Sequence, residues 1–191
     1  MSSTALPPLT TLPPFLLAAT LSGYGLYLCK ENITRLQQYE SASEKAAEWS
    51  NTAAQRLHKT RATQTSGTLS LALSFIASTT LPFLPGHTYH TSTVLGITGI
   101  ALGALLYTSR THMHNFWNER TQTKIPFVEK FNDAIRGSET VVVLLEVLAF
   151  SWGVAGCVWA LEWGVLGLGL WAGVVGARGA WAFNQVGGKV E

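Results

Sequence analysis

The longest apolar stretch of the sequence covers residues 140–183 and contains only three charged side chains in 44 residues. About 20 apolar residues are enough for a helix to cross a bilayer, so this stretch predicts two crossings joined by a turn. We place the turn at residues 161–164, where Glu162 supplies a charge and two tryptophans supply rings that favour a membrane interface. A four-span alternative, in which the last run lies on the membrane surface, is weaker because that run has no polar face.

Three more apolar runs precede this pair, so the sequence predicts an all-α bundle of five transmembrane helices, with short amphipathic helices outside the membrane. Only 13% of the residues are charged, whereas soluble domains have roughly 25%. We expect a single transmembrane domain over residues 13–183, between an N-terminal tail (1–12) and a C-terminal tail (184–191). The expected spans are residues 13–29, 67–84, 92–108, 140–160 and 164–183, with extramembrane helical segments at 31–62 and 110–138.

All thirteen Lys and Arg residues fall on one side of the membrane in this topology. Six lie between the first and second spans and five between the third and fourth, whereas the alternate connections have none. Because cytoplasmic segments carry an excess of Lys and Arg, we expect a cytoplasmic C-terminus and an N-terminus on the non-cytoplasmic side. The lipid bilayer is therefore the expected partner. A net charge of +2, with acids interleaved among the bases, excludes a nucleic-acid partner.

The two basic segments contain local helix signals. Ser41 and Glu44 have the spacing of a capping box, which predicts a break near residue 41 and a second helix over about residues 42–61. In the second segment, Pro126 can open a short helix and Gly137 can end it. We expect this short helix to lie along the membrane interface before the fourth span begins.

Small residues recur at helical spacing in several spans, and such rows are more often helix-packing seams than ligand paths. Span five has the richest row, so it is the predicted surface for a homo-oligomer or for another membrane protein. The predicted seams are Ser66, Ser70, Ser74 and Ser78 in span two, Gly96, Gly99 and Gly103 in span three, and Gly169, Gly173 and Gly176 in span five.

Two charged residues, Glu146 and Arg178, lie inside predicted spans, where such groups are costly and call for a partner. Each is sixteen residues from Glu162, so both lie about 24 Å from the turn and share a depth. An intramembrane ion pair would then tie spans four and five together. The alternative, weighted equally, is that each side chain reaches separately toward the interface.

The histidines do not have the spacing of a metal centre, and we expect neither a metal nor a cofactor. His87 and His90 lie on the opposite side of the membrane from His58, His112 and His114. The sequence also lacks a phosphate-binding loop, a dinucleotide-binding glycine pattern and a nucleophile elbow.

The layout of residues 13–160 resembles that of small anthrone-oxygenase-like membrane proteins. Those proteins carry Asn residues just after the third span and an aromatic, His and Arg arrangement leading into the fourth. The corresponding residues here are Asn115 and Asn118, then Phe131, Asn132 and Arg136. This chain departs from the pattern because it has no His between Phe131 and Arg136 and because a fifth span follows. The resemblance implies cofactor-poor oxygenation of an aromatic polyketide, with His112, Asn115 and Arg136 as the first catalytic positions to test.

Abundant packing seams and few convergent polar groups favour a non-enzymatic integral membrane protein with an assembly, tethering or accessory role. The alternative is a small membrane-embedded enzyme, oxygenase-like, acting on a lipophilic or aromatic polyketide substrate. It requires His58, His112, His114, Glu119 or Arg136 to converge on one cavity. A channel or carrier ranks last because the spans offer few polar positions to line a path.

Overall fold

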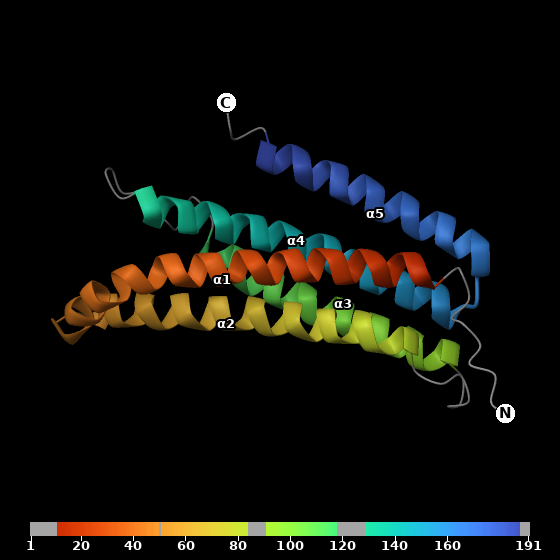
Figure 1. Ribbon diagram of the computed structural model, residues 1–191, viewed down its shortest axis with the longest axis horizontal. Coiled ribbons are helices and arrows are strands. Elements are labelled where there is room, and N and C mark those ends of the chain that lie inside the picture. The colour runs from red at the N-terminus through yellow and green to blue at the C-terminus, as the bar shows by residue number, and fades with distance from the viewer. Residues whose placement is uncertain (1–10, 50, 84–90, 118–128, 188–191) are drawn as a thin grey trace.

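Five long helices form a bundle, as the sequence predicts, in a computed structural model that describes residues 11–49, 51–83, 91–117 and 129–187 (Figure 1). They are α1 (Leu12–Trp49), α2 (Asn51–Thr80), α3 (Thr91–Phe116), α4 (Glu129–Ala160) and α5 (Gly164–Gly187), and a short 3-10 turn, η1 (Leu81–Phe83), follows α2. Each of these five helices contains a segment long and apolar enough to cross a membrane.

The first two helices form an antiparallel hairpin that extends beyond the others at one end of the bundle (Figure 1). The predicted break near residue 41 is wrong, because α1 continues to Trp49 and α2 begins at Asn51. Extending an existing helix by one residue is far easier than starting a new one. The sequence from 26 to 66 contains no Gly or Pro, so the capping box does not interrupt the helix. The side chains of Ser41 and Glu44 lie outside the described residues.

We call this end of the bundle the basic end, because the junction of α1 with α2 and the start of α4 lie there, and most Lys and Arg residues of the sequence are in or near these segments. The predicted interfacial helix ended by Gly137 is also wrong, because α4 begins at Glu129 and continues through Gly137. A Cβ at position 137 would overlap the side-chain amide of Asn32 in α1. This glycine therefore allows α1 and α4 to approach each other, while Pro126 lies outside the described residues.

Glycines bring α3 and α4 into backbone contact. A Cβ at Gly99 would lie 2.7 Å from the Cα of Gly156, and one at Gly103 would lie 2.9 Å from the N of Gly153. The predicted glycine row of α3 therefore faces α4, and two glycines of α4 meet it. Close backbone approach of this kind is how helices associate without a hydrophobic driving force between them.

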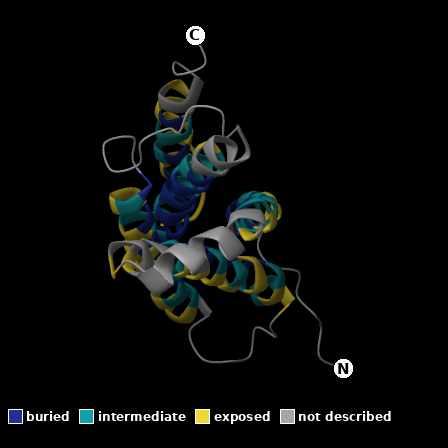
Figure 2. Cartoon of the chain, turned by 90° about the vertical axis from the view of Figure 1, so that its left-hand side faces the viewer, coloured by how far each residue is buried: buried dark blue, intermediate teal, exposed yellow. Residues whose placement is uncertain are grey.

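The centre of the bundle is α4, which contributes more buried side chains than any other described helix (Figure 2). Its large buried residues include Leu145, Leu148 and Trp152. Trp152 and Trp159 make ring contacts with Phe15 of α1, with centroids 5.9 Å and 5.1 Å from the phenyl ring. An aromatic cluster thus fixes the start of α1 against α4.

A tight turn at residues 161–163 joins α4 to α5. The backbone N–H of Leu161 donates to the carbonyl of Cys157 at 3.0 Å, and that of Trp163 donates to Val158 at 3.2 Å. Glu162 has φ 54°, in the left-handed region, and its carboxylate accepts a hydrogen bond from Ser92 Oγ at 2.8 Å. This turn sends α5 back along α4 toward the basic end (Figure 1).

Candidate functional site

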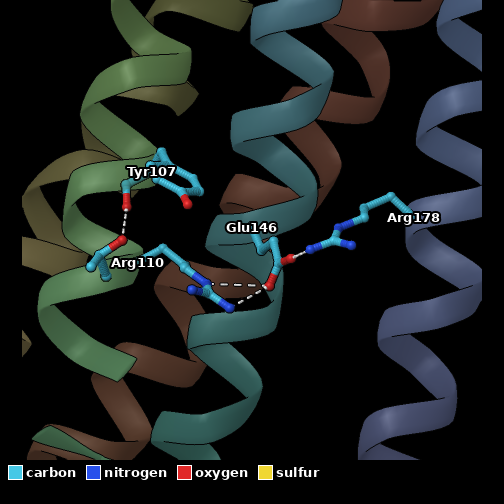
Figure 3. A network of polar contacts seen from close by, with 5 residues as sticks. Tyr107, Arg110, Glu146 and Arg178 are labelled. Atoms are coloured by element: carbon cyan, nitrogen blue, oxygen red, sulfur yellow. Dashed lines mark hydrogen bonds and ion pairs between the residues drawn. The ribbon is translucent and has the colours of Figure 1, made fainter. Parts of the chain in front are cut away.

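A carboxylate lies between two guanidinium groups at one level of the bundle (Figure 3). Arg110 of α3 donates from Nε and Nη2 to Glu146 Oε2, at 3.2 Å and 3.0 Å. Arg178 of α5 donates from Nη2 to the other oxygen, Oε1. The side chain of Glu146 is 4% exposed, whereas those of Arg110 and Arg178 are 21% and 32% exposed. We call these three residues the triad.

Arg110 is the member that the sequence analysis did not single out. The expected third span ended at residue 108, which left Arg110 in the connecting segment, but α3 continues to Phe116. Arg110 lies seven residues beyond Gly103, and Glu146 lies seven residues before Gly153. Because Gly103 and Gly153 touch and the helices are antiparallel, two helical turns along each helix bring Arg110 and Glu146 together. The glycine register is therefore the signal that could have found this contact.

Arg178 also contacts two aromatic rings. Its guanidinium carbon lies 4.9 Å from the centroid of Phe150 and 4.2 Å from that of Trp181. Phe150 is one turn beyond Glu146 on α4, and Trp181 is one turn beyond Arg178 on α5. Cation–π contacts therefore support the ion pair that holds α5 to α4. Of the two alternatives for Glu146 and Arg178, the structure contains the pair.

Three members of the serine row of α2, Ser66, Ser70 and Ser74, are hydrogen-bonded to other helices, whereas Ser78 donates to the carbonyl of Phe75 in its own helix. Ser74 Oγ accepts from Trp152 Nε1 at 2.8 Å and shares a 2.8 Å hydrogen bond with Ser22 Oγ of α1. Ser70 Oγ lies 2.5 Å from Ser109 Oγ of α3. Because these buried hydroxyls bond to neighbouring helices, the row is a polar packing seam in this structure.

A second polar layer lies nearer the basic end. Trp117 Nε1 donates to Thr63 Oγ1 at 3.0 Å, and Gln64 Nε2 donates to Ser138 Oγ at 2.9 Å. These bonds join α2 to the end of α3 and to α4. Buried polar layers of this kind fix the relative register of helices, because a slipped register would leave several groups unpaired.

The residues proposed for an enzyme are exposed wherever the structure describes them. His112, His114, Asn115 and Arg136 are exposed, and so is His58, while Glu119 and Asn118 lie outside the described residues. His112 Nδ1 makes a 3.2 Å contact with Ser66 Oγ. Within the described ranges, no group of three His, Cys, Asp or Glu side chains is placed to hold a metal ion.

The glycine row of α5 points away from the bundle. A Cβ at Gly169, Gly173 or Gly176 would have no atom within 4 Å, in contrast to the glycines of α3. Trp171 and Val175 are buried against α4, and Trp171 Nε1 donates to Ser151 at 3.2 Å. At 100° per residue, the row lies on the opposite side of α5 from Trp171 and Val175.

Comparisons with protein families, curated proteins and solved structures find no match to this chain. The resemblance to anthrone-oxygenase-like proteins therefore stays a prediction.

Proposed function

We propose that this chain is a multi-pass integral membrane protein with a non-enzymatic assembly role, and that it associates with a second copy of itself through α5. The open glycine face of α5 carries this proposal. The corresponding glycines of α3 are used inside the bundle, whereas those of α5 have no neighbour in the monomer. Rows of small residues let transmembrane helices approach closely, so this face suits another helix.

The surface composition supports a membrane environment. Large apolar side chains are exposed on α1, α2, α3 and α5, among them Leu16, Leu69, Ile97 and Leu166. Monomeric soluble proteins rarely expose so many contiguous apolar groups, whereas lipid tails cover them at no cost. The one-sided distribution of Lys and Arg supports the orientation with the basic end in the cytoplasm.

A second copy suits the α5 face for two reasons. A two-fold dimer packs the same patch of both subunits together, and a row of small residues is complementary to itself. The only Lys or Arg in α5, Arg178, is already paired with Glu146 of its own chain. A partner helix at this face therefore needs no acidic residue inside the membrane.

The test enlarges one residue on this face. Ala180 continues the glycine row and is exposed, while Ala104 is an exposed alanine on α3. We expect Ala180→Leu to reduce the dimer fraction of labelled protein in nanodiscs at least tenfold, because the added side chain separates the backbones. Ala104→Leu adds the same atoms elsewhere and leaves the dimer fraction unchanged. Photobleaching steps per nanodisc measure both.

A wild-type chain that stays monomeric at every protein-to-lipid ratio would contradict self-association. Equal loss of dimer in Ala180→Leu and Ala104→Leu would contradict the assignment to α5. The enzymatic alternative has less support, because the described residues named for it are exposed.

A further inference from the structure

The triad has more positive than negative charge. Two guanidiniums share one carboxylate, so Arg110, Glu146 and Arg178 together carry a net charge of +1. Neither α3 nor α5 contains any Asp or Glu. The nearest acid on α4, Glu139, is seven residues away, about 10 Å along the helix, and has an interaction of its own. In a low-dielectric environment an unbalanced charge is unfavourable, so the triad favours an additional anion.

The arginines, and not the carboxylate, reach the protein surface. Each guanidinium has five N–H donors, of which Arg110 uses two and Arg178 uses one on Glu146. Arg178 Nε is buried and has no hydrogen-bond partner among the described atoms. One carboxylate therefore leaves donors on both arginines unused, and both arginine side chains are partly exposed.

The depth of the triad places these donors close to one membrane surface. Arg178 is fourteen residues after Gly164, about 21 Å along α5, whereas the hydrocarbon core is about 30 Å thick. Arg178 therefore lies about 9 Å below the interface at the basic end. Trp181 is exposed one turn nearer that interface, where tryptophan rings are enriched. Because Arg178 is held on Glu146, a lipid phosphate has to come below the interface to reach the triad, as happens where a bilayer thins locally around a charged side chain.

From the charge, the donors and the depth, we infer that the triad binds the phosphate of an anionic phospholipid in the leaflet at the basic end. Exposed large side chains flank both arginines, with Tyr107 one turn before Arg110 on α3 and Trp181 beside Arg178. These surfaces suit acyl chains, and they favour a lipid over a free anion from solution. Phosphate oxygens accept the multiple N–H donors that arginine offers.

The test varies the net charge of the triad by single steps. The variants Arg110→Gln and Arg178→Gln lower it to zero, Glu146→Gln raises it to +2, and Lys30→Gln removes an exposed cation outside the triad. Each protein is reconstituted with phosphatidylcholine mixed with phosphatidylglycerol, and native mass spectrometry counts the phosphatidylglycerol retained after delipidation. We expect the amount of retained phosphatidylglycerol to rise by about fivefold for each added unit of positive charge on the triad.

Glu146→Gln makes this test independent of folding. A purely structural role for Glu146 predicts that this variant retains less phosphatidylglycerol than the wild type, whereas the lipid site predicts that it retains more. The double variant Glu146→Gln with Arg178→Gln keeps the net charge at +1, so it retains lipid as the wild type does. Equal retention of phosphatidylglycerol in all variants would overturn the inference. So would a loss of retention in Lys30→Gln as large as the loss in Arg110→Gln and Arg178→Gln.

A parallel measurement distinguishes the lipid from a solute anion. Inorganic phosphate is added to lipid-free protein in a neutral detergent, and the melting temperature is recorded. We expect no shift. A rise in melting temperature that Arg178→Gln abolishes would assign the site to free phosphate and overturn the lipid inference.

Discussion

At the scale of single residues, the carboxylate of Glu146 connects three helices. It accepts hydrogen bonds from α3 and α5 while its own helix is the most buried of the bundle. Removing one partner from a buried ion pair is strongly destabilising, because the remaining charge is left uncompensated. The two arginines make this position more sensitive than a simple pair, since any change at Glu146 affects both contacts.

Charge reversal at this position tests the three-residue arrangement. We expect Glu146→Lys to lower the unfolding free energy by about 3–5 kcal/mol, because the new ammonium group would face two arginines. Adding Arg178→Glu restores one attraction but leaves Arg110 against the new cation, so recovery is partial. Adding Arg110→Glu as well gives the larger recovery. Denaturant unfolding in detergent measures all four proteins, and full recovery in the double variant would show that Arg110 makes no contribution.

At the scale of helices, glycine positions determine how closely α3 and α4 approach. A Cβ at Gly156 would lie 2.7 Å from the backbone N of Ile100, whereas one at Gly153 would have no atom within 4 Å. The two glycines are three residues apart on the same helix, so a substitution at one serves as the control for the same substitution at the other. Of the two, only Gly156 has no room for a side chain.

Alanine substitutions at these two positions should therefore change the stability of the fold in opposite directions. We expect Gly156→Ala to destabilise by about 1–3 kcal/mol, because backbone atoms must move apart. Gly153→Ala should stabilise by up to about 1 kcal/mol, because alanine is the better helix former. Thermal unfolding in the same detergent compares them. Similar shifts for both variants would rule out the close contact of α3 with α4.

The elements differ in how far the sequence predicts them. Run length and charge predict five helices, because burial of apolar surface depends on composition over about 20 residues. The capping box at residue 41 did not end a helix, because propagation of the existing helix is more favourable. Gly137 did not end a helix either, because it lies within α4 where Asn32 of α1 packs closely against it. Arg110 was missed because the polarity of residues 109–112 ends the apolar run while the helix continues. Partners of the serine row depend on register, which composition does not encode.

At the scale of the whole molecule, five described helices are long and apolar enough to cross a bilayer, so the proposed membrane topology places the two ends of the bundle on opposite sides of it. Gln55 is exposed in the part of α2 that extends beyond the basic end, and Phe83 is exposed in η1, beyond the other end of α2. A helix of this length between them crosses the hydrocarbon core once. In the proposed orientation, which rests on the distribution of Lys and Arg, the end with Gln55 faces the cytoplasm.

Cysteine labelling of intact cells tests this orientation. In a background with Cys29→Ser and Cys157→Ser, we expect a membrane-impermeant maleimide to label Phe83→Cys from outside and to label Gln55→Cys only after permeabilisation. Reversed labelling would contradict the orientation but keep the crossing of α2. Labelling of both cysteines from outside would contradict the crossing of α2, and the shared depth of Glu146 and Arg178 inside a membrane would then lose its basis. The two sites thus test separately the charge rule and the crossing of α2.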